Sequence, residues 1–299
     1  MNTDLPARLR LHVQTLAGDI GDRHHGLPDA YQAAADHILD HWKQLGQVPN
    51  IQTYDASGHA AHNLVVELPG VTQPDQIIIL GAHYDTCPSG LGNPGADDNA
   101  SAVAGLLEAG RQLIEQHAKT PFAKTLRLVA FANEEPPYFH SPSMGSKVYA
   151  DQCVSAHESI TAMICLEMIG YYDDAHVEQH GRQHFPDALL DLLPDHEQFI
   201  AAVGDENSQD LLATFTKAFR AATDFELFPH ASAPAAQALW LSDHGPFWDH
   251  NIPALMITDT SMVRNPHYHQ PTDLPDTLDY DNMAEVVKGT AAVVGELLG

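Results

Sequence analysis

Four short, dense apolar runs constrain the fold of this chain more than any other feature. They read "QIIILGAH", "TLRLVAFAN", "TAMICLEM" and "PALMITDT", at residues 76–83, 125–133, 161–168 and 253–260. Their apolar residues do not alternate with polar ones, which is typical of strands that are buried on both faces of a sheet. Segments with apolar residues at every third or fourth position lie between or after these runs and predict helices at residues 99–117, 145–152, 209–222 and 281–298. Strands that alternate with helices predict an α/β sandwich.

The rest of the chain fits the same single unit. Helical patterns at residues 5–16 and 31–45 come first, and "NIQTYDAS" and "HNLVVELPG" flank Ser57-Gly58 as the two strands of a hairpin. Residues 171–196 are rich in His and Asp and have no clear period, so we expect a loop or an insertion there. Because no repeat, low-complexity tract or flexible linker divides the chain, residues 1–299 are expected to form one domain.

Composition excludes several classes of partner. The formal net charge of −26 argues against nucleic acid and against an anionic membrane surface. Three cysteines, Cys87, Cys153 and Cys165, are too few for a disulfide scaffold and suit a reducing compartment. No stretch has the apolar length of a signal peptide core or of a membrane span. We therefore expect a soluble cytoplasmic protein, with its oligomeric state left open.

Acidic residues and histidines follow the four apolar runs. In an open α/β sheet, ligands collect at the carboxyl ends of the strands, so these side chains should converge on one edge of the sheet. A set of His and carboxylate donors suits Zn²⁺, Mn²⁺ or Co²⁺. The side chains concerned are those of His83, Asp85, Glu134, Glu135, Glu167, His267 and His269.

Two acidic pairs, Asp97-Asp98 and Glu134-Glu135, each have alternative roles. Two neighbouring cations need a bridging anion, and Asp97 is placed for it, although "ADDN" before a helix is also a common helix cap. Glu134 and Glu135 follow a buried strand and are costly to bury without compensating charge. One of them can bind metal while the other accepts a proton, or both can be solvated loop acids.

Six motifs of this chain resemble those of the M28 metallopeptidases, the co-catalytic zinc aminopeptidases, and occur in the same order as in that family. They are "GAHYDT", "PGADDNAS", "NEE", "LEMIG", "SDHGPF" and "HQPTDLPDTLDY". The resemblance runs from about Leu80 to Leu298 and implies a three-layer α/β/α sandwich around a mixed, mostly parallel sheet. It also implies two Zn²⁺ per chain, with Co²⁺ or Mn²⁺ as possible substitutes.

The resemblance assigns a role to each site residue. It implies that His83 and Glu167 hold one zinc, Glu135 and His269 hold the other, and Asp97 bridges them. Glu134 would be the general acid and base, Asp85 would hydrogen-bond the free ring nitrogen of His83, and the Asp97-Asp98 peptide would be cis. His244 would lie near the substrate carbonyl or behind the metal ligands, although Asp243 and His244 could also simply cap a turn, and His267 would be a rim residue.

Two departures from the family pattern concern the site. Many members carry Asp where this chain has Glu167, and "PPYFHSPSM", residues 136–144, replaces a shorter link. Tyr138, Phe139 and His140 in this insertion could line the substrate pocket or pack beneath a loop.

The resemblance implies removal of N-terminal residues from peptides by water that a metal pair activates. A glutaminyl cyclase with one zinc has the same architecture and a longer loop after its Glu pair, so it is the alternative. A non-catalytic metal-binding protein of this fold is a third possibility, but every ligand position implied by the family is occupied here.

Overall fold

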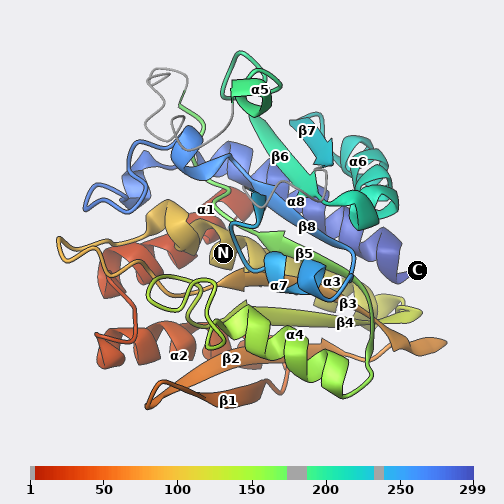
Figure 1. Cartoon of the computed structure of the whole chain (residues 1–299). Coiled ribbons are helices and arrows are strands. Elements are labelled where there is room, and N and C mark those ends of the chain that lie inside the picture. The colour runs from red at the N-terminus through yellow and green to blue at the C-terminus, as the bar shows by residue number, and fades with distance from the viewer. Residues whose placement is uncertain (1–3, 174–186, 232–238) are drawn as a thin grey trace.

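The computed structural model describes residues 4–173, 187–231 and 239–299 and contains one mixed sheet (Figure 1). Within these ranges the sheet has eight strands in the order β1-β2-β4-β3-β5-β8-β6-β7. The central strands β4, β3, β5 and β8 pair in parallel, whereas β1, β2 and β6 run antiparallel to their inner neighbours and β7 is parallel to β6. The mixed, mostly parallel sheet is thus confirmed. The bounds are β1 Asn50–Ala56, β2 His59–Leu68, β3 Gln73–His83, β4 Lys124–Phe131, β5 Ser159–Leu166, β6 Phe199–Gly204, β7 Glu226–Ala231 and β8 Ala254–Thr258.

Helices cover both faces of the sheet (Figure 1). One face carries α1 Leu5–Val13, α2 Pro28–Gln44, α3 Ala102–Lys119, α6 Gln209–Ala222 and α8 Tyr280–Leu298, and the other carries α4 Gly145–Ser155 and α7 Gly245–Asp249. Side chains of β3 alternate between the hydrophobic cores on the two faces of the sheet. Ile78 and Leu80 pack on the first face, and Ile77 and Ile79 pack on the second. The predicted α/β/α layering is therefore confirmed.

β6, β7 and α7 were not predicted from the sequence. The β7 run contains Pro229, which reads as a strand breaker in an isolated sequence. In the structure β7 lies at the edge of the sheet, where a missing backbone N–H costs no ladder hydrogen bond. Of the segment expected to be a loop, residues 174–186 lie outside the described ranges, and the short helix α5 Asp187–Leu190 follows them.

None of the described helices has the length and apolar character needed to span a membrane.

Candidate active site

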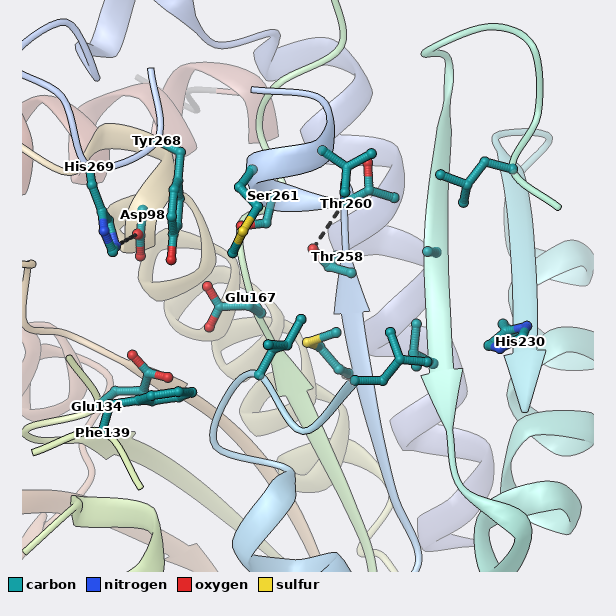
Figure 2. A pocket seen from close by; sticks show the side chains of 18 of the residues that line it. Asp98, Glu134, Phe139, Glu167, His230, Thr258, Thr260, Ser261, Tyr268 and His269 are labelled. Carbon is teal, nitrogen blue, oxygen red and sulfur yellow. Dashed lines mark hydrogen bonds and ion pairs between the residues drawn. The ribbon is translucent and has the colours of Figure 1, made fainter. Parts of the chain in front are cut away.

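The predicted site residues meet at the carboxyl edge of the parallel strands. His83 ends β3, Glu134 and Glu135 follow β4, Glu167 follows β5, and His269 lies in the connection from β8 to α8. Because β3, β4, β5 and β8 are neighbours and parallel, their carboxyl ends bring these side chains together, and Glu134, Glu135, Glu167 and His269 line one cavity there (Figure 2).

His83 is the centre of a first group of donors. Its Nε2 lies 3.3 Å from a carboxylate oxygen of Glu167 and 3.5 Å from Asp98 Oδ1. All three side chains are at least nine-tenths buried, and one donor atom from each lies within 4.8 Å of the others. The geometry is that of a set that could hold a metal ion.

His269 is the centre of a second group. Its Nε2 lies 3.0 Å from Asp98 Oδ2 and 3.2 Å from Glu135 Oε1. Cys87 joins this group, since its sulfur, a Glu135 oxygen and a His269 nitrogen all lie within 4.8 Å of one another. The two oxygens of Asp98 therefore face the two histidines, one each. Cys87 was not predicted to belong to this site, although it stands only two residues after Asp85.

Asp98, and not Asp97, lies between the two donor groups, which is contrary to the expectation for Asp97. The Asp97 carboxylate points into the protein, where it accepts hydrogen bonds from the Gly170 N–H at 2.9 Å and from Asn265 Nδ2 at 2.7 Å. Those two donors use both of its oxygens. The cis peptide is likewise shifted by one residue and joins Asp98 to Asn99.

Two further aspartates fix the backbone around the donors. Both oxygens of Asp85 accept backbone N–H groups, from Glu134 at 3.0 Å and Glu135 at 3.1 Å, and its Oδ1 lies 3.5 Å from His83 Nδ1. Asp273 accepts the N–H groups of Asp97 and Asp98. These contacts set the direction of each donor-bearing loop before any ion binds.

Arg23 holds the loop that leads to Asp98 from behind. Its fully buried guanidinium donates to the backbone carbonyls of Tyr84 at 2.9 Å, Pro94 at 2.6 Å and Gly95 at 2.8 Å. The residue lies before α2, so a segment far upstream of the donors supports their position.

The electrostatics of the cluster fit divalent cations. Burial raises the pKa of Glu134 well above its usual value and that of Glu135 to about 7. Burial acts to lower the pKa of His83, but the charges of Glu167 and Glu134 outweigh it and raise that pKa. Among the described residues no Lys or Arg forms an ion pair with these carboxylates.

Several buried polar atoms of the cluster also lack a hydrogen-bond partner. They are both ring nitrogens of His83, Oε1 of Glu135 and Nε2 of His269. Buried polar atoms are normally satisfied, so such a group of atoms around one space is what a metal site without its ions should look like. The residues present therefore fit a pair of divalent ions.

An apolar cavity opens from the donors toward β6 and β7 (Figure 2). It holds about 180 Å³, with Asp98, Glu134, Glu135, Glu167 and His269 at one end. Most of the remaining wall is aliphatic or aromatic, formed by residues that include Leu190, Leu193, Val203, Phe228, Leu239, Leu241, Met256 and Val263.

The residues of the insertion after Glu135 differ in role, because some line the substrate pocket and others do not. Phe139 lines the cavity, whereas Tyr138 is buried against His25 and donates its hydroxyl hydrogen bond to the Ala56 carbonyl. His140 stacks on Trp240 with ring centroids 4.2 Å apart. Of the three, Phe139 thus forms pocket wall, Tyr138 is buried beneath the loop, and His140 lies exposed against Trp240.

His244 is not among the residues that line the cavity, so its position argues against a direct contact with the substrate. Its ring is fully buried and its Nε2 lies 2.8 Å from the carbonyl oxygen of Leu239, a wall residue. The neighbouring Ser242 donates a hydrogen bond to Glu167. His267 is bound to Thr272 through Nδ1 and is not among the cavity-lining residues. The motif around His244 therefore supports the wall and Glu167 from behind.

Comparison of the sequence with known proteins gives a consistent result. The model of peptidase family M28 matches residues 63–294. The uncharacterized protein YfbL of Escherichia coli K12 is 37% identical over 295 residues, which cover 97% of this chain and 87% of YfbL. Leucine aminopeptidase 1 of Emericella nidulans is 25% identical over 256 residues, and the match spans 83% of this chain but only 58% of that longer protein.

Solved structures show the same fold. BSAP, a zinc aminopeptidase from Bacillus subtilis, superposes with a TM-score of 0.76 at 14% identity, covering 99% of this chain and 96% of that one. A glutaminyl cyclase from Fimbriiglobus ruber superposes with a TM-score of 0.71 at 19% identity, with coverage of 99% and 96%. Since the family model covers most of the sequence and a relative above 30% identity spans nearly all of it, the chain belongs to peptidase family M28.

Proposed function

We propose that this protein is an aminopeptidase that uses two divalent ions, zinc by preference, to remove large apolar residues from peptide N-termini. The observation that carries the proposal is the pair of donor groups on either side of Asp98, with the free carboxylate of Glu134 beside them. His83, Asp98 and Glu167 would hold one ion, and Asp98, Glu135 and His269 the other. When bound, such ions polarise the peptide carbonyl and acidify water.

Glu134 is the general base and acid of this proposal. It belongs to neither donor group, lies 3.8 Å from His83 Nε2, and faces the same cavity. Its backbone N–H is fixed by Asp85, which limits where the carboxylate can point. A carboxylate in this position can accept a proton from the attacking water and deliver it to the leaving amine.

The shape of the cavity supports the substrate class. The acidic end would attract the protonated N-terminal amine, and the apolar remainder would take the first side chain. Protein cavities of about 150 Å³ with aliphatic walls accommodate benzene, so about 180 Å³ is enough for a leucine or phenylalanine side chain.

Glutaminyl cyclisation is the second candidate, because a glutaminyl cyclase shares the fold. Two features weigh against it. The donor group of His83, Asp98 and Glu167 is complete, so a second ion has a place. The cavity wall is largely apolar, whereas a glutamine side chain carries an amide that needs polar partners.

The test is a substrate panel with the purified, zinc-loaded protein. We expect hydrolysis of Leu- and Phe-anilides at least tenfold faster than of Ala- or Asp-anilides, two zinc ions per chain, and loss of activity on chelation that zinc reverses. Peptides with N-terminal Gln should lose their first residue without releasing ammonia. Cyclisation of those peptides by a protein with one zinc would establish the alternative, and inactivity toward every substrate would refute both.

A further inference from the structure

Cys87 lies beside one of the two donor groups of the candidate active site. It is half-buried on the loop between β3 and the turn that carries Asp98. Its sulfur lies within 4.8 Å of a donor atom of Glu135 and one of His269. The other two cysteines are fully enclosed: Cys153 packs in the core beside Arg127, and Cys165 lies 3.6 Å from Ser242 Oγ.

The neighbours of Cys87 provide independent evidence of a ligand site. Glu135 is 4% exposed, yet its Oε1 has no hydrogen-bond partner. Nε2 of His269 is also buried without a hydrogen-bond partner. Donors around tetrahedral zinc are about 3.3 to 3.8 Å apart, since the Zn–N, Zn–O and Zn–S bonds are about 2.0 to 2.3 Å long. Atoms within 4.8 Å of one another therefore need only small shifts to close on one ion.

We propose that Cys87 supplies a thiolate ligand to the ion held by Glu135 and His269. The inference rests on the proposed two-ion function, and it adds that the two metal positions differ in the chemistry of their ligands. When the ion enters, the S–H bond of Cys87 breaks, its proton leaves to solvent, and a sulfur lone pair binds the metal. No oxidant or reductant takes part.

The consequence is a division of roles between the two positions. Cys87, Glu135, His269 and Asp98 complete a four-donor set, which is typical of a closed site. His83, Glu167 and Asp98 leave one position open for water or substrate. The soft sulfur selects zinc or cadmium over manganese or magnesium at the closed position, whereas the N/O set at the open position discriminates less.

The experiment compares wild-type protein, Cys87→Ser and the matched control Cys153→Ser, each stripped and reloaded with Co²⁺. Wild type and the control should show a near-ultraviolet thiolate-to-cobalt charge-transfer band, and Cys87→Ser should lack it. In calorimetric titrations of the apo proteins with zinc, run in two buffers of different ionisation enthalpy, Cys87→Ser should release about one proton fewer than wild type.

The outcomes separate this inference from the proposed function. If wild type binds two ions and hydrolyses peptides but shows no thiolate band, or if the band persists in Cys87→Ser, the role of Cys87 is wrong and the function stands. If wild type binds no more than one ion and hydrolyses nothing, the proposed function fails. Should Cys87→Ser not fold, alkylation of wild type decides: zinc must protect Cys87 from iodoacetamide, and alkylated apo protein must reload with cobalt without the band.

Discussion

Asp97 and Asp98 are adjacent and chemically identical, so exchanging each for asparagine tests the site assignment directly. The Asp98→Asn change removes the negative charge that faces His83 at 3.5 Å and His269 at 3.0 Å. The Asp97→Asn change alters a carboxylate whose contacts run to Gly170 and Asn265 instead. We expect the first variant to lose metal and the second to lose only stability.

The structure sets the size of both effects. Loss of a group that merely supports one metal ligand lowers affinity about 10- to 100-fold. Asp98 contacts a histidine of each donor group, so its neutralisation should weaken zinc binding by at least about 100-fold, or about 2.7 kcal/mol. Asn in place of Asp97 keeps one acceptor oxygen, and loss of the hydrogen bond to the other oxygen should cost about 1–3 kcal/mol. That loss should lower Tm by less than about 10 °C.

The assay is equilibrium dialysis against chelator-buffered zinc with elemental analysis, together with thermal unfolding of the apo proteins. Wild type and Asp97→Asn should retain two ions at a free zinc concentration that leaves Asp98→Asn largely empty. A metal-free Asp97→Asn beside a fully loaded Asp98→Asn would reverse the assignment and refute the reasoning.

Three further predictions follow from the site and its surroundings. Glu134→Gln should reduce turnover of a Leu-anilide by at least about 100-fold while both ions remain bound, and unchanged turnover would exclude the residue as the base. Val203→Phe should fill the cavity and raise the KM for Leu- and Phe-anilides relative to the Ala-anilide, with apo-protein Tm as the folding control. Burial lowers the pKa of His41 to about 4, so the unfolded chain binds the extra proton between about pH 6.5 and pH 4 and stability falls as pH falls through that window. After allowance for partial exposure, the loss of unfolding free energy is about 1 kcal/mol at pH 5. His41→Gln should therefore lose less Tm between pH 7.5 and pH 5 than wild type. An equal loss in both proteins would show that His41 does not destabilise the fold at low pH.

The parts of the fold that depend on pattern could be predicted from the sequence. Dense apolar runs identified β3, β4, β5 and β8, and 3.6-residue periodicity identified α3, α6 and α8 within a few residues. Both signals report burial, which is local in the sequence. β7 was missed because the effect of its Pro229 depends on where the strand lies in the sheet, and only the tertiary structure fixes that.

The site shows the same division. Residues that directly end or follow a buried strand, such as His83, Glu135 and Glu167, could be placed at one sheet edge by topology alone. Asp97 and Asp98 could not be told apart, because the direction of each side chain is set by contacts with Gly170, Asn265 and His269, up to 171 residues away along the chain. Cys87 follows no period and became a candidate only once His269 was seen beside it.

Arg23 has a consequence for how this enzyme can be dissected. The family match begins at residue 63, but the guanidinium that fastens the loop before Asp98 comes from forty residues earlier. A fragment trimmed to the matched region would leave three carbonyl oxygens without the guanidinium that donates hydrogen bonds to them. The loop before Asp98 would then lose this support. The region that holds Asp98 in place is therefore longer than the region of sequence similarity, and any shortened version should retain Arg23 and the N-terminal helices.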